Sequence, residues 1–173
     1  MKRPRPIIEP IQPDAFICSA MMECMTDMQL ANLALAHAGS EPVRNFAIHL
    51  IEDCNRMLLD IARIATRKNL PVPKSLDAEH EQVLQRMRES IGSDFDTAYM
   101  ERNALHHRHA IALFKRGQTI KNPEISALAS RALATVEARI RMSRLWSGSV
   151  DQLLDGQGIA PATSSSGLGQ TGL

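Results

Sequence analysis

Hydrophobic residues between positions 43 and 65 recur every three or four residues, which is the period of one face of an α-helix. This apolar stripe consists of Val43, Phe46, Ala47, Leu50, Ile51, Cys54, Met57, Leu58, Ile61, Ile64 and Ala65. Polar residues occupy most of the remaining positions. The pattern predicts an amphipathic helix that ends near Lys68, before the Pro-containing segment 70–73.

Three other long segments show the same period, and they predict helices over residues 14–37, about 94–115 and about 123–146. Asp14 is a candidate N-cap of the first helix, and Gly39 and Ser40 follow its end. A shorter apolar pattern predicts a small helix within residues 75–89. No period-2 strand pattern of useful length is present, so the chain is expected to be all-α.

The short link after the first helix predicts an antiparallel hairpin, and the last two long helices form a second pair. The connection over residues 68–93 is much longer. Two helix pairs joined by one long connection are typical of a ferritin-like four-helix bundle, here with a short extra helix in the crossover. The competing arrangement is an up-down-up-down bundle with the short helix packed outside. The predicted organisation is a Pro-rich arm over residues 1–13, the bundle over 14–147 and a flexible Gly/Ser-rich tail over 148–173.

Composition excludes several classes of protein. The net charge is +1, with 20 basic and 19 acidic residues, which gives no broad basic surface for nucleic acid. No apolar run approaches the ~20 residues of a membrane span. The N-terminus lacks the apolar core of a secretory signal, and there is no CxxC motif, so reduced thiols in the cytoplasm are expected. The aromatic share is 3%, which an Ala-, Leu- and Met-packed bundle tolerates.

Several segments together resemble one known family. They are residues 27–34, Val43-Arg44-Asn45-Phe46-Ala47, residues 51–55, and Phe95-Asp96-Thr97-Ala98-Tyr99 with the following His107. In order and spacing they are similar to the bacterial domain-of-unknown-function family numbered 4142, over roughly residues 14–146. The resemblance implies a ferritin-like helical fold. The family has no established biochemical role and its members are often exported, so the resemblance implies a fold more than an activity.

The resemblance also marks positions for a metal centre. Asp27 corresponds to the family's helix-one Glu, Asp53 and Cys54 to an Asp-His pair, and His107 to a third-helix His. The fourth-helix His corresponds to Arg139, so two ligands are replaced. Acidic and His side chains from facing helices hold di-metal centres in bundles, usually with Glu-x-x-His pairs, and this chain contains no Glu-x-x-His.

Counting residues from the hairpin turn places Asp27 and Cys54 at one level, which His107 can reach from the third long helix. These three side chains would suit zinc or another borderline metal. Arg139 argues against such a site, because a permanent cation repels a metal ion. We therefore expect Arg139 to pair with Asp27 or Asp53, which would replace the metal with an ion pair.

Other candidates have simpler interpretations. His106, His107 and His109 are expected to be one packed and two solvated imidazoles rather than metal ligands. The methionines Met21, Met22, Met25 and Met28 are expected to fill the core or an interface. Cys54 is expected to be a buried thiol and not a nucleophile, because no activating base beyond His107 is evident.

The main functional hypothesis is an uncharacterised ferritin-like protein with a degenerate metal site and a non-catalytic structural or interaction role, stress-related by analogy. It implies no cofactor, and a second copy or a helical protein as partner. The alternative is a metal-binding (di-metal or zinc) or ferroxidase-like protein that uses Asp27, Asp53, Cys54 and His107. A third interpretation is self-association through the Met-rich helix.

Overall fold

The computed structural model describes residues 10–155, with side chains up to residue 143. These residues form five helices and no β-strand: α1 (Pro13–His37), α2 (Glu41–Lys68), α3 (Ala78–Arg88), α4 (Gly92–Gly117) and α5 (Pro123–Asp155). The all-α class predicted from the sequence is confirmed. No described helix is both long and apolar enough to cross a membrane.

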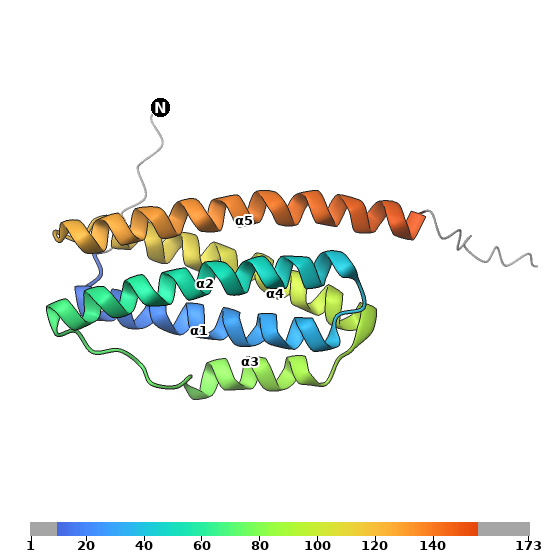
Figure 1. The fold of residues 1–173 in the computed structure, drawn as a ribbon, viewed down its shortest axis with the longest axis horizontal. Coiled ribbons are helices and arrows are strands. Elements are labelled where there is room, and N and C mark those ends of the chain that lie inside the picture. The colour runs from blue at the N-terminus through green and yellow to red at the C-terminus, as the bar shows by residue number, and fades with distance from the viewer. Residues whose placement is uncertain (1–9, 156–173) are drawn as a thin grey trace, which may run out of the picture.

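The four long helices form a bundle in which every neighbouring pair is antiparallel (Figure 1). α1 packs against α2 and α4, and α5 packs against the same two helices from the other side. α2 and α4 therefore lie diagonally opposite each other and run in the same direction. The short α3 lies outside the bundle along α1 and returns the chain to the end where α2 began. This single crossover is the predicted ferritin-like arrangement, and the up-down-up-down alternative is wrong.

α1 is the most enclosed helix. It is apolar on nearly every side because α2, α3 and α4 all cover it. Phe16, Ile17 and Ala20 have no exposed surface, and Leu30, farther along the helix, is only 2% exposed. Burial of each large side chain stabilises the fold by about 1.5–3 kcal/mol.

The helices end at local sequence signals, but the predicted N-cap of α1 is wrong. α1 begins at Pro13 after Gln12, so Asp14 lies in the first turn and is not the N-cap. Pro favours the first helical position because it has no N–H to leave unpaired there. α2 stops after Lys68, as predicted, where Asn69 adopts a left-handed conformation with φ of 52°.

The predicted boundary at residue 148 falls inside a helix, because α5 continues to Asp155. One glycine costs a helix only about 1 kcal/mol, and no proline occurs over residues 147–155. The helix therefore passes through Gly148. The rest of the predicted tail (156–173) and most of the predicted N-terminal arm (1–9) lie outside the described residues.

Candidate functional site

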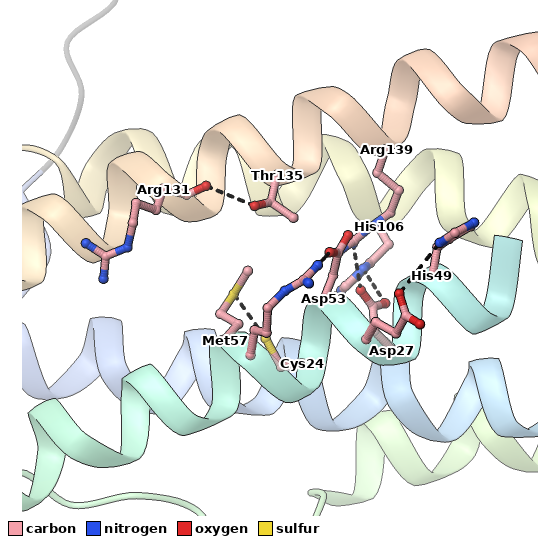
Figure 2. Close-up of polar contacts among 11 residues, drawn as sticks. Cys24, Asp27, His49, Asp53, Met57, His106, Arg131, Thr135 and Arg139 are labelled. Carbon is pink, nitrogen blue, oxygen red and sulfur yellow. Dashed lines mark hydrogen bonds and ion pairs between the residues drawn. The ribbon is translucent and has the colours of Figure 1, made fainter.

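Charged side chains from all four long helices meet inside the bundle (Figure 2). Asp27 of α1, His106 of α4 and Arg139 of α5 are each only 4–5% exposed. Glu23 of α1 and Asp53 of α2 lie at the edge, with side chains 21% exposed. We call these five residues the buried charge network.

Asp27 is the centre of the network. Its Oδ1 lies 2.8 Å from His106 Nδ1, and its Oδ2 lies 3.4 Å from Arg139 Nη1. Glu23, one helical turn before Asp27, contacts the other ring nitrogen of His106, Nε2. The imidazole of His106 is thus placed between two carboxylates of the same helix. A protonated imidazole can donate to both.

Arg139 extends the network to α2. Its Nη2 lies 3.5 Å from Oδ2 of Asp53, while Oδ1 of Asp53 accepts a 2.5 Å hydrogen bond from Arg56. The Arg139 guanidinium therefore sits between a carboxylate of α1 and a carboxylate of α2. An arginine stays protonated at any relevant pH, so this position holds a fixed positive charge.

The network shifts the acid–base behaviour of its members. Burial pushes the pKa of Asp27 upward, but the charge and hydrogen bond of His106 and the charge of Arg139 outweigh it and hold the pKa below its usual value. Burial pushes the pKa of His106 downward, but Asp27 and Glu23 outweigh it and raise the pKa. Both shifts favour the ionised forms, so each group stabilises the charge of the other.

His107 behaves differently from its neighbour His106. It is 3% exposed and packs edge-on against Phe46, with ring centroids 6.4 Å apart. Burial and the nearby charge of Arg139 lower the pKa of His107 to about 4. His107 is therefore a neutral imidazole that lines the network without an ion-pair contact to Asp27.

Cys54 is also near the network but is not joined to it by a polar contact that the structure records. Cys54 is 1% exposed, and the adjacent Cys24 thiol, burial and the charge of Asp27 raise the pKa of its thiol well above the usual value. Among the described side chains, no group of three or more His, Cys, Asp and Glu residues is arranged to hold a metal ion. The set Asp27, Cys54 and His107 considered from the sequence is thus not brought together as ligands.

Sequence reasoning missed two members, Glu23 and His106. The spacing of Glu23, four residues before Asp27, was a usable signal, because i and i+4 share a helix face. His106 follows Asn103 and Tyr99 at helical spacing, and both of those residues are buried. The expectation of one packed histidine is wrong: both His106 and His107 are buried, and His109 is exposed.

Comparisons with solved structures show where else this fold occurs. A DUF305 fragment from Deinococcus radiodurans has a TM-score of 0.71 at 17% identity, and the match covers 82% of this chain and 99% of that chain. A putative secreted DUF305 protein from Streptomyces coelicolor has a TM-score of 0.64 at 15% identity, covering 75% and 87%. CopM in its Cu(II)-bound form has a TM-score of 0.67 at 18% identity, covering 80% and 97%. At these identities the likeness shows the fold alone.

A search of the curated proteins found no significant match. A family model described as "Domain of unknown function (DUF4142)" matches residues 8–144, which include every member of the buried charge network. This match agrees with the resemblance found in the sequence. The chain therefore belongs to the DUF4142 family.

Proposed function

We propose that this chain is a structural or interaction member of its family, in which ion pairs replace a metal ion at the polar centre of the bundle. The observation that supports this proposal is the position of Arg139, within 3.5 Å of carboxylate oxygens of both Asp27 and Asp53. Those oxygens are the groups that a di-metal centre would use as ligands. A guanidinium beside them neutralises the carboxylates and repels an incoming cation.

The environment of the network also favours a structural role over catalysis. Its central residues are 4–5% exposed, so a substrate has little access to them. A hollow of about 380 Å³ in the described surface lies elsewhere, between the end of α2 and the start of α5. It is lined by Ile64, Arg67, Pro123, Glu124, Ala127 and Arg131, none of which belongs to the network.

Thermal unfolding with a chelator tests this proposal directly. We expect the same melting temperature with and without EDTA, and no increase on adding Zn²⁺, Mn²⁺ or Fe²⁺, because a ligand stabilises only the state that binds it. Asp27→Asn should lower the melting temperature equally in both conditions. Stoichiometric divalent metal in the purified protein, together with a chelator-induced drop that Asp27→Asn abolishes, would contradict the proposal.

The alternative is a metal-binding or ferroxidase-like protein that uses Asp27, Asp53, Cys54 and His107. Its supporting observation is that CopM, a structure of similar fold, is described in a Cu(II)-bound form. Iron oxidation assays separate the two hypotheses: the alternative requires turnover of Fe²⁺ that is lost in Asp27→Asn. The ion-pair account expects no turnover above buffer.

The proposed partner is a second copy of this chain or another helical protein, with no nucleic acid involved. Sedimentation velocity over a wide concentration range tests self-association, and a concentration-independent monomer would leave a different protein as the partner.

The cytoplasm remains the proposed compartment, and a stress-related role remains a prediction.

A further inference from the structure

A second cluster of chemically active side chains lies next to the buried charge network, between α1 and α2 (Figure 2). The Cys24 thiol of α1 lies 3.2 Å from the thioether sulfur of Met57 on α2. Cys54 is one turn before Met57 on the same helix and therefore shares its face. We call Cys24, Cys54 and Met57 the sulfur cluster. All three are buried, with exposed fractions of 4%, 1% and 8%.

We propose that the sulfur cluster binds one monovalent copper ion, Cu(I), through the thiolates of Cys24 and Cys54 and the thioether of Met57. Thiolate and thioether sulfur are soft ligands that select Cu(I). Structural zinc sites need four ligands, usually thiolates and imidazoles, and the described side chains offer no such group here. Iron–sulfur clusters are typically held by four cysteines, and the chain has three. The composition of the cluster therefore favours copper over these metals.

Copper binding is coupled to proton release, because the thiolate and not the thiol is the ligand. Two thiols and one Cu(I) give a copper bis-thiolate of charge −1 and two protons, which pass to solvent. The affinity for Cu(I) should therefore rise with pH.

The contact between Cys24 and Met57 requires only a small adjustment to bind an ion. Metal–thiolate bonds are about 2.3 Å long, so two sulfurs on one ion stand roughly 4 Å apart. The sulfur atoms of Cys24 and Met57, which are 3.2 Å apart, must therefore move apart by about 1 Å. Methionine adapts readily because it has three rotatable bonds and no branch.

Two further methionines lie near Cys24 along α1. Met21 is one turn before it and Met28 one turn after it, and both are half-buried. In the proposed route, copper passes from solvent to these soft thioethers and then to the cluster.

Anaerobic titration with Cu(I) against a coloured Cu(I) chelator tests the proposal on the full chain. We expect one tightly bound equivalent, a loss of affinity of at least a hundredfold in Cys24→Ser and in Cys54→Ala, and a roughly tenfold loss in Met57→Leu. Cys18→Ser is the matched control, because Cys18 is half-exposed and its thiol donates to the Pro71 carbonyl, away from the cluster. Circular dichroism checks that each variant keeps its helices.

X-ray absorption at the copper edge identifies the ligands independently of these variants. Sulfur as the only neighbour of copper supports the proposal. Nitrogen or oxygen neighbours, copper lost in Cys18→Ser but kept in Cys24→Ser, or no competition with the chelator would overturn it. Asp27→Asn should retain one equivalent of copper, so failure at the sulfur cluster is distinguishable from failure of the ion-pair account at Asp27.

Discussion

Replacing Arg139 with methionine should destabilise the protein by about 3 kcal/mol, because removal of one partner from a buried ion pair costs about 3–5 kcal/mol. Arg139 is 5% exposed and lies close to carboxylates of two other helices, Asp27 and Asp53. The lower end of the range applies since neither acid is left alone: Asp27 keeps His106, and Asp53 keeps Arg56. Methionine retains most of the side-chain volume and is a good helix former, so the decrease in stability reports mainly the removal of the charge.

Arg131→Met is the matched control. Arg131 is also on α5 and contacts Asp60 at 3.3 Å, a similar distance, but these side chains are 59% and 39% exposed. Exposed pairs contribute about 0–1 kcal/mol. The two variants undergo the same substitution on the same helix and lose the same net charge. The difference between them therefore isolates the effect of burial.

Urea unfolding followed by circular dichroism measures both free energies of unfolding at neutral pH. At about 2–4 °C per kcal/mol for a chain of this size, Arg139→Met should melt roughly 6–12 °C below the wild type. Arg131→Met should stay within a few degrees. Equal losses in the two variants, or a gain in stability for Arg139→Met, would refute the reasoning.

Three further predictions follow from particular contacts. The pKa of His107 in the folded state is about 4, so stability should fall by about 3 kcal/mol as pH drops from about 6.5 to 4, since the unfolded chain takes up this proton first. His107→Asn should flatten that fall in a plot of melting temperature against pH, and a plot parallel to that of the wild type would contradict the prediction. The raised pKa of His106 has the opposite effect on stability. Its contribution to the free energy of unfolding is complete below about pH 6.5 and is lost as pH rises through the folded-state pKa, so His106→Gln should flatten the alkaline side of the same profile. Gly117→Ala should destabilise by about 1–3 kcal/mol from overpacking, because the added methyl would lie 2.6 Å from Phe16 Cζ and 2.8 Å from Ala129 Cβ; a more stable variant in urea unfolding would show that the neighbours yield.

The long helices were predictable because each buried face repeats at the helical period. α2 shows this most clearly, since one side faces the core and the other faces solvent. The extent of α5 was less predictable: Gly148 and the serines around it resemble a linker in composition, yet helix continues to Asp155. A composition change marks the end of a helix less reliably than a proline or a left-handed residue such as Asn69 does.

The site was predictable only in part, because a single helix can bury two adjacent faces at once. α4 packs against both α1 and α5, so it buries an arc wide enough to include His106 and His107 together. Sequence spacing ranks neither histidine above the other. Which imidazole meets Asp27 depends on how α4 is rotated against α1, and that rotation is set by packing across the whole bundle.

The coupling free energy between Asp27 and Arg139, measured in EDTA by a double-mutant cycle, tests the central claim most directly. The cycle combines Asp27→Asn and Arg139→Met and compares the double variant with the sum of the single variants. If the ion pair itself holds the centre of the bundle, the coupling should be about 1–3 kcal/mol and should not change when divalent metal replaces the chelator. A coupling below about 0.5 kcal/mol in EDTA, or one that appears only with metal, would contradict the account.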